Sequence, residues 1–265
     1  MKRQLLTLTA LLGLSLMLFS CSDDDKTTGP DVEKDVVYIN NNVNTYVYDE
    51  YDLDSDGKPI AETTHKDSLN FEQEVNKDGK SAREYKTFTN ESGSYEEAET
   101  TYYSSEKNKL YIHSSVLLST FGSLQAEGIS LGDILTFGNE WFLLADAKAA
   151  AGVKKTIYTD EVTTDFNEVN VTADIKAETF RDGTKSVMVN NESKEAHIYK
   201  VNVNVSVNSI ASFDILAEFY VVPELGIVKR KVIPFSFTIP FAGTTSVNGI
   251  EQVLVNYYMT VQADS

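Results

Sequence analysis

The chain of 265 residues has little cysteine, histidine and positive charge: one Cys, three His, and 23 Lys plus Arg against 40 Asp plus Glu. A single cysteine excludes an internal disulfide framework and any CxxC metal or redox site. The net charge of −17 excludes a sequence-independent nucleic-acid binder, which needs cations to displace counterions from phosphates. Phosphate-binding Gly-rich loops, G-x-S-x-G elbows and H-E-x-x-H motifs are also missing. We therefore expect no enzyme activity, no cofactor and no nucleic-acid partner.

One long uncharged run is present, and it lies at the N-terminus. Lys2 and Arg3 precede residues 4–20, which carry no charge and are rich in leucine. The run ends in Leu18-Phe19-Ser20-Cys21, which resembles a bacterial lipobox, where the cysteine thiol receives a diacylglycerol and becomes the first mature residue. We expect residues 1–20 to be a lipoprotein signal peptide and Cys21 to be the lipidation site. The alternatives are an uncleaved anchor and an ordinary signal peptide with a stray cysteine.

The residues after Cys21 are acidic and lack apolar periodicity. Ser22-Asp23-Asp24-Asp25-Lys26 resembles the export tags of some surface-displayed lipoproteins. Residues 21–35 are therefore predicted to be a flexible acidic tether. The expected location is the bacterial outer membrane, on its periplasmic or cell-surface face, with the lipid on Cys21 as the contact to the membrane.

Period-two alternation dominates the rest of the chain. In residues 201–208 four valines alternate with small polar residues, as a half-buried antiparallel strand requires. Shorter runs of this kind occur in residues 46–48, 69–75, 83–88 and 169–175. Asp56-Gly57, Asp78-Gly79, Asp182-Gly183 and residues 190–193 are predicted to form turns, since Asp-Gly and Asn-rich pairs accept positive φ.

Helix signals are sparse. Leu117, Phe121 and Leu124 recur at helical spacing, and the Ala-rich residues 144–151 could form two turns. With 42% hydrophobic residues and no internal repeat or Pro/Gly/Ser-rich break, residues 36–265 are predicted to form a single domain. The predicted fold is mainly β: one curved antiparallel sheet, a half-barrel, with one or two short helices.

The segment from Tyr220 to Lys229, YVVPELGIVK, resembles the aromatic–x–x–Pro–x–x–Gly–(Ile/Val)–Val–Lys signature of bacterial lipoproteins of the DUF3108-like and lipoprotein-carrier (LolA/LppX-like) half-barrel families. The resemblance covers residues 136–262. It implies an open cup formed by a curved sheet, with helical segments across its mouth, and it brings no catalytic residue. The chain departs from these families at residues 189–192, where a small-residue Ala-Gly-Thr-Phe stretch is usual and Val-Asn-Asn-Glu stands instead. Pro223 and Gly226 are typical of a turn in any case.

Candidate ligand-binding residues are few. Asp52, Asp54 and Asp56 form a D-x-D-x-D-G pattern that could bind calcium, but Thr63 stands where the loop needs a bidentate glutamate, so we expect a plain acidic turn and no metal, with calcium binding as the alternative. His65, His113 and His197 are far apart in the sequence.

Two further clusters stand out. Lys229-Arg230-Lys231 either contacts an anion such as a lipid headgroup or offsets neighbouring acidic strands on the solvent side. Phe235, Phe237 and Phe241 either line a cavity or pack in the core.

Three functions fit these features. The first is a non-enzymatic outer-membrane lipoprotein that binds an apolar ligand or lipid in its cup or acts as an envelope scaffold. The second is a surface-exposed module for a glycan or a protein, with exposed aromatics such as Tyr46 and Tyr48. The third is a hydrolase, which would need a His–carboxylate or Ser–His pair brought together by the fold.

Overall fold

The computed structural model describes residues 35–259, apart from residues 91–92, 123, 127–128, 134, 136, 167–168, 208–210 and 240–242. The predicted signal peptide, Cys21 and the predicted tether up to residue 34 lie outside the described residues. In chain order the elements are β1 (Val43–Leu53), β2 (His65–Lys77), β3 (Lys80–Asn90), β4 (Glu96–Glu106), β5 (Lys109–His113), α1 (Ser114–Gly122), β6 (Gln125–Ala126), β7 (Ile129–Ser130), the 3-10 helix η1 (Leu131–Asp133), β8 (Trp141–Asp146), β9 (Lys155–Phe166), β10 (Val169–Val189), β11 (Glu192–Val207), β12 (Ala211–Val222), β13 (Gly226–Val232), β14 (Phe235–Ile239), β15 (Gly243–Val247) and β16 (Gly249–Met259).

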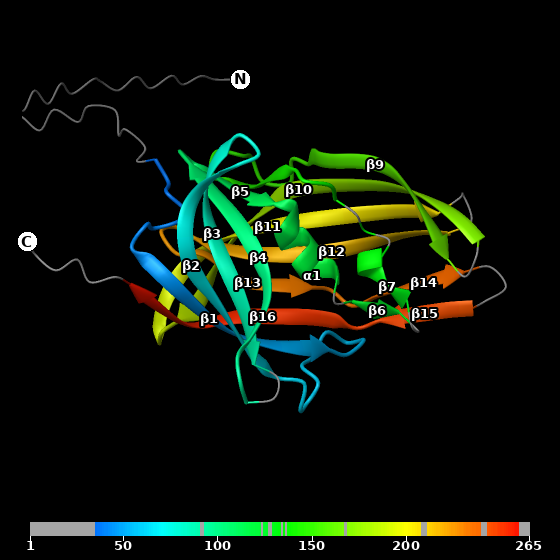
Figure 1. The fold of residues 1–265 in the computed structure, drawn as a ribbon, viewed down its shortest axis with the longest axis horizontal. Coiled ribbons are helices and arrows are strands. Elements are labelled where there is room, and N and C mark those ends of the chain that lie inside the picture. Colours follow the sequence, from blue (N-terminus) through cyan, green and yellow to red (C-terminus); the bar gives the residue numbers. More distant parts are fainter. Residues whose placement is uncertain are drawn as a thin grey trace, which may run out of the picture. The chain divides into compact units, whose positions relative to one another are not determined.

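A 12-stranded antiparallel sheet dominates the domain, in the order β8-β5-β4-β3-β2-β1-β16-β13-β12-β11-β10-β9. Most neighbours follow one another in the chain. There are two exceptions. β8 pairs with β5 although α1, β6, β7 and η1 stand between them in the chain, and β16 lies between β1 and β13 and so joins the first strands to the last ones (Figure 1). The predicted fold class, mainly β with one curved antiparallel sheet, is confirmed.

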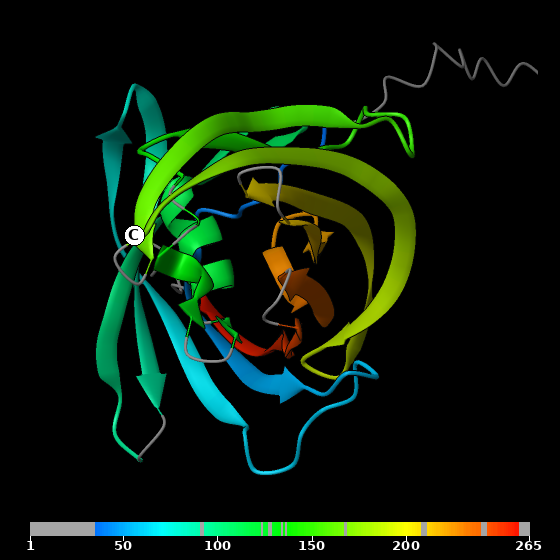
Figure 2. The same cartoon turned by 90° about the vertical axis from the view of Figure 1, so that its right-hand side faces the viewer.

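The sheet curls until its edge strands β8 and β9 come close to each other, with α1 inside the curve (Figure 2). At this seam, side chains of β10 take the place of backbone pairing. Thr179 Oγ1 donates to the carbonyl of Leu144 at 3.2 Å, and Arg181 NH1 donates to the carbonyl of Ala147 at 3.0 Å. The sheet is therefore nearly closed and curves further than the predicted half-barrel.

Turn chemistry explains two of the hairpins and one misprediction. Asp78-Gly79 joins β2 to β3 and Asn190-Asn191 joins β10 to β11, all four residues at positive φ as predicted. Asp182-Gly183 is not a hairpin. β10 continues through it, with a register shift between Arg181 and Thr184 and a φ of 99° at the glycine. A glycine at positive φ also fits a β-bulge, so the local pattern could not separate the two outcomes.

The helix α1 confirms the prediction around Leu117 and Phe121, both fully buried. The second predicted helix, residues 144–151, is wrong: β8 continues to Asp146 and a turn follows. Pairing of β8 with β5 outweighs the helical preference of alanine, which is a fraction of a kcal/mol per residue. Among the described residues, no helix has the length and apolar character needed to cross a membrane.

Buried side chains form two cores. The larger lies between α1 and β8–β12 and includes Val201, Val203 and Val205, each 0% exposed, which confirms the alternation in β11. The smaller combines residues of β1–β3 with residues of β10–β13 and β16, and it is rich in tyrosine. Burial of these apolar groups supplies the main stabilisation of the fold.

The segment before β1 is part of the domain. Tyr38 is fully buried, the N–H of Glu224 donates to the carbonyl of Val37 at 2.8 Å, and the N–H of Asn40 donates back to the carbonyl of Glu224 at 3.0 Å. The predicted Pro223–Gly226 turn between β12 and β13 is confirmed. Its backbone therefore pairs with residues 37–40 and anchors the N-terminal segment.

Candidate functional site

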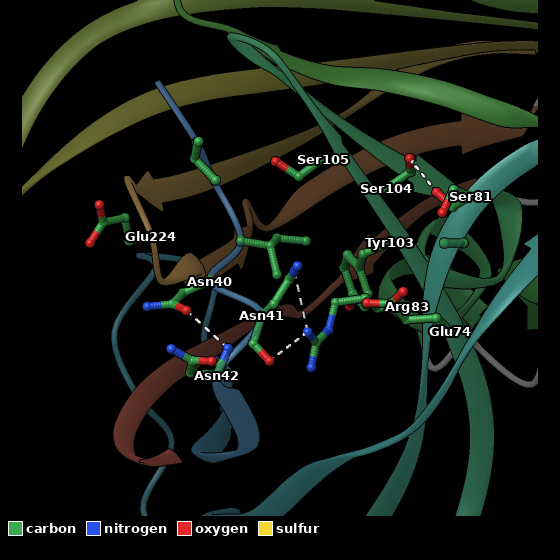
Figure 3. A pocket seen from close by; sticks show the side chains of 13 residues that line it. Asn40, Asn41, Asn42, Glu74, Ser81, Arg83, Tyr103, Ser104, Ser105 and Glu224 are labelled. Carbon is green, nitrogen blue, oxygen red and sulfur yellow. Dashed lines mark hydrogen bonds between the residues drawn. The ribbon is translucent and has the colours of Figure 1, made fainter. Parts of the chain in front are cut away.

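A cavity of about 550 Å³ lies between residues 37–42, strands β2–β4 and the turn after β12 (Figure 3). We call it the polar cavity. Its volume is within the range of small-molecule sites, roughly 300–1,000 Å³. Three of its lining residues are apolar, namely Val37, Ile39 and Ala82. The others are polar or charged: Asn40, Asn41, Asn42, Glu74, Ser81, Arg83, Tyr103, Ser104, Ser105 and Glu224.

Arg83 on β3 orders one wall of the polar cavity. Its NH1 donates to the backbone carbonyl of Asn41 at 2.8 Å, its NH2 to that of Val43 at 3.1 Å, and its Nε to the hydroxyl of Tyr85 at 3.0 Å. The guanidinium also lies 3.9 Å from the centre of the Phe71 ring. Because its donors are engaged by the protein, Arg83 shapes the cavity and holds residues 41–43 in place.

Short hydrogen bonds order the remaining walls. Asn40 Oδ1 accepts from the N–H of Asn42 at 2.9 Å, and Ser104 Oγ donates to the carbonyl of Ser81 at 2.7 Å (Figure 3). The amide of Asn42 is on an exposed residue. These walls present both donors and acceptors to anything that enters.

The charge of the polar cavity selects against anions. Glu74 and Glu224, both exposed, contribute two carboxylates, whereas Arg83 is engaged by the protein as described above. An apolar ligand would leave amides and hydroxyls unsatisfied, at about 1–3 kcal/mol for each buried group. The lining therefore matches a neutral ligand that bears hydroxyl groups.

Two smaller cavities lie among the buried side chains. They measure about 30 and 20 Å³, and both are lined by Tyr48, Leu69, Tyr103 and Ile227 together with other residues. Cavities of this size hold one or two water molecules. Neither has room for an acyl chain, so these parts of the cup are filled by the protein's own side chains.

A row of polar side chains crosses four neighbouring strands within the fold. His65 on β2 is opposite Glu50 on β1, Glu50 is opposite Gln252 on β16, and Gln252 is opposite Arg230 on β13. Directly opposed residues of antiparallel strands share one face of the sheet. Asp67, two residues after His65, shares that face because side chains alternate along a strand.

We call His65, Glu50, Gln252, Arg230 and Asp67 the buried row. Ion pairs and hydrogen bonds within the row shift the pKa values of its members. Arg230 NH2 lies 3.1 Å from Glu50 Oε2, and Gln252 Nε2 donates to Glu50 Oε2 at 3.1 Å and to Asp67 Oδ2 at 2.7 Å. Burial would raise the pKa of Glu50, but the contacts with His65 and Arg230 outweigh it and lower this pKa to about 2. Hydrogen bonding to Glu50 raises the pKa of His65 to about 9, and burial followed by the charge of Glu50 raises the pKa of Asp67.

The other histidines also have partners. His113 Nε2 lies 3.2 Å from Asp78 Oδ2, while its Nδ1 lies 3.3 Å from Ser115 Oγ and accepts the Ser115 N–H at 3.3 Å. Asp, His and Ser are thus in contact as the hydrolase hypothesis requires. However, His113 is 3% exposed and caps the first turn of α1, and the three residues line none of the cavities described above. His197 Nδ1 lies 3.3 Å from the hydroxyl of Tyr38.

The D-x-D-x-D-G residues form an acidic turn, as expected. Asp54 Oδ1 accepts the N–H groups of Asp56 and Lys58, both at 2.9 Å. Asp56 Oδ2 pairs with Lys58 Nζ at 3.1 Å, and Gly57 takes φ 74°. The backbone carbonyl of Asp52 accepts the N–H of Ile60 at 2.9 Å. The carboxylates of Asp54 and Asp56 thus already have partners within the turn.

The basic cluster divides between the two faces of β13. Lys229 Nζ and Lys231 Nζ lie 2.7 and 3.6 Å from the Glu251 carboxylate, as expected for lysines that offset an acidic strand. For Arg230 that prediction was wrong, because successive strand residues point to opposite faces and Arg230 joins the buried row.

The aromatic predictions also divide. Phe235 and Phe237 stack on Phe213 with ring centres 5.8 and 4.6 Å apart, so these two pack against the core; Phe241 lies outside the described residues. Tyr46 and Tyr48 were predicted to be exposed, but each is 5% exposed. They face the smaller core because that face of β1 lies inside the curve of the sheet.

Comparison with known proteins assigns the chain to no family. No family model matches the chain, and no curated protein matches it. A predicted lipoprotein from Parabacteroides distasonis superposes with a TM-score of 0.49 at 13% identity, covering 85% of this chain and 100% of that one. A predicted exported protein with a YmcC-like fold from Bacteroides fragilis gives a TM-score of 0.42 at 10% identity, with the same coverage. Values this low carry no conclusion about function, and the resemblance to the DUF3108-like and LolA/LppX-like families stays a prediction.

Proposed function

We propose that the protein is a non-enzymatic, lipid-anchored binding module of the bacterial outer membrane, and that it binds a neutral saccharide in the polar cavity. The anchor is the lipid on Cys21. The ligand site lies where β2 and β4 end and β3 begins, next to residues 37–42, which precede β1.

The observation that supports this proposal is the composition of the polar cavity. Amide, hydroxyl and carboxylate groups surround a volume of about 550 Å³, and a saccharide offers the matching hydroxyl donors and acceptors. The two exposed carboxylates, Glu74 and Glu224, disfavour an anionic ligand.

An apolar ligand inside the cup is the alternative, and the small size of the two interior cavities argues against it. Burying an acyl chain would require displacing buried side chains such as Tyr48 and Leu69, which already pack in the smaller core. A pure envelope scaffold would not need a cavity of this size and polarity.

A binding titration tests the ligand assignment. The full chain is purified in a detergent without a sugar headgroup, and neutral oligosaccharides and a fatty acid are titrated by calorimetry. We expect saccharide binding that the double variant Asn42→Ala/Glu74→Gln weakens at least tenfold, because it removes two polar groups of the polar cavity. Glu72→Gln is the matched control, since Glu72 is an exposed carboxylate on the same strand that does not line the cavity.

Three results would contradict this assignment. They are fatty-acid binding without saccharide binding, saccharide binding that the double variant leaves unchanged, and an oligosaccharide recovered in shortened form after incubation, which would reveal an enzyme.

Anchoring is tested separately by metabolic labelling with an alkyne fatty acid and by membrane fractionation. The native chain should carry the label and sediment with the outer membrane. Cys21→Ser should lose the label and leave the membrane fraction, because serine offers no thiol for the thioether. A labelled or membrane-bound Cys21→Ser chain would contradict the anchor.

A further inference from the structure

Three ligand-type atoms face one another in the buried row, away from the polar cavity. His65 Nε2 lies 3.5 Å from Glu50 Oε1 and 3.8 Å from Asp67 Oδ1, and all three atoms lie within 4.8 Å of one another. In a tetrahedral zinc site with bonds of about 2.1 Å, neighbouring ligand atoms are separated by about 3.4 Å. The observed spacing therefore needs only small side-chain movements to close around an ion.

The outer atom of each of these groups is held by another part of the protein. The second ring nitrogen of His65, Nδ1, lies 3.4 Å from the carbonyl of Thr63, which orients the ring with Nε2 toward the carboxylates. Gln252 donates to Glu50 Oε2 and to Asp67 Oδ2. Metal-binding histidines and carboxylates typically have such outer partners, which fix the orientation of the ligand atom.

Asp67 adds an independent observation. Its side chain is 5% exposed, and its Oδ1, the atom turned toward His65, is buried without a hydrogen-bond donor among the described residues. A buried carboxylate oxygen without a donor is costly. His65 Nε2 faces this oxygen from 3.8 Å, beyond hydrogen-bond distance, and a metal cation bound between the two atoms supplies a partner at bonding distance.

The local charge favours a divalent cation. Glu99 lines the same small cavity as Arg230 and Gln252, and it lies close enough to Arg230, Asp67 and Glu50 for their charges to act on its carboxyl group. When ionised, the three carboxylates outnumber the single guanidinium of Arg230 by two. In the metal-free chain the raised pKa of His65 keeps its imidazole protonated, so a bound divalent ion has to displace that proton. Once it is bound to the neutral imidazole, the ion balances the difference of two charges.

From this arrangement we propose that Glu50, His65 and Asp67 bind a divalent transition-metal ion of the zinc type. Nε2 of His65, Oε1 of Glu50 and Oδ1 of Asp67 are the protein ligands, and a water molecule completes the coordination. His65 has a side chain that is 24% exposed, which gives the ion a path from solvent. The ion joins β1 to β2 and is independent of the saccharide proposal.

Calorimetry on the full chain tests this proposal. The chain is purified in detergent without a polyhistidine tag, stripped with EDTA and titrated with zinc chloride. We expect one ion per chain with a dissociation constant in the micromolar range or below. X-ray absorption of the loaded chain should show nitrogen and oxygen ligands, with the scattering of one imidazole and without sulfur.

Substitutions then locate the ion. Asp67→Asn and His65→Ala should each weaken zinc binding at least 100-fold. His197→Asn is the matched control, because His197 is also partly buried and hydrogen-bonded but lies outside the buried row, and it should bind as the native chain does.

Two results would overturn the proposal: no stoichiometric zinc binding below millimolar concentration, or the same affinity in Asp67→Asn as in the native chain. Circular dichroism shows whether each variant folds. If His65→Ala does not fold, the nearly isosteric Asp67→Asn and the absorption spectrum of the native chain decide.

Discussion

Tyr38 and Tyr199 share a buried hydrogen bond of 2.8 Å between their phenol oxygens, although 161 positions separate them in the chain. This contact ties the segment that follows the predicted tether to the middle of β11. Burial and the partner hydroxyl raise the pKa of Tyr38 far above its usual value, so both groups stay protonated. The contact therefore fixes the segment that precedes β1 to the core of the domain.

Replacing Tyr38 by Phe should lower the free energy of unfolding by about 1–3 kcal/mol, because it leaves the buried hydroxyl of Tyr199 without this partner. Urea unfolding followed by fluorescence measures the effect. Tyr95→Phe serves as the control: Tyr95 is 48% exposed, and its change should stay within about 0.5 kcal/mol. Equal stability of the two variants would contradict a structural role for the Tyr38 hydroxyl.

Thr179→Val should loosen the seam, because it removes the hydrogen bond from Oγ1 to the carbonyl of Leu144. We expect a loss of about 1 kcal/mol and faster amide hydrogen exchange in β8. Thr159→Val is the comparison, since Thr159 is exposed and its hydroxyl donates only to the neighbouring carbonyl of Tyr158. Unchanged exchange in β8 would show that the seam is held by other contacts.

Gly249→Ala should be destabilising. A Cβ at this position would lie 2.3 Å from the carbonyl oxygen of Val232 and 2.8 Å from Pro234 Cδ, so the backbone must shift, at about 1–3 kcal/mol. Gly122→Ala should instead raise the free energy of unfolding. The atom nearest to an added Cβ would be 3.9 Å away, and alanine is favoured over glycine in a helix by up to about 1 kcal/mol. Thermal unfolding of both variants checks the pair.

Stability should fall as the pH drops below about 6.5, in part through His113. Burial, and then the charge of Lys77, lowers the pKa of His113 below its ordinary value of 6.5. Between that value and the lower folded-state pKa, the unfolded chain binds a proton that the folded chain does not. His113→Asn keeps an acceptor at the start of α1 and removes this titration.

His113→Asn should therefore lose less stability than the native chain between pH 7 and pH 5. The urea concentration at the midpoint of unfolding measures this loss for each protein. Parallel curves for the two proteins would show that His113 does not contribute to the pH dependence.

Asp54→Ala should lower the free energy of unfolding by about 1 kcal/mol, since one carboxylate oxygen accepts two backbone N–H groups in the turn. Millimolar calcium should leave the unfolding midpoint of the native chain unchanged, because these acceptors already have partners. A calcium-dependent rise in the midpoint that Asp54→Ala abolishes would instead support the alternative, calcium binding by Asp52, Asp54 and Asp56.

Several features could be predicted because their signals are local. The valines of β11 alternate along one strand, and Asp78-Gly79 accepts the two positive φ values that its hairpin needs. The helix over Leu117 and Phe121 likewise follows from spacing within three turns. The segment 144–151 was mispredicted because its composition fits a helix, whereas its hydrogen bonds come from β5 and β10, which the local pattern does not show.

The sequence by itself determined that the chain is acidic, rich in β-strands and equipped with a lipobox-like segment at Cys21. Tertiary structure alone decided which side chains meet. Glu50 and Gln252 are 202 positions apart, and His65 meets Glu50 through the pairing of β1 with β2. Register and curvature decide these contacts, and both arise from the packing of the whole sheet. The polar cavity likewise exists because residues 37–42 return to the end of β12, which no local pattern encodes.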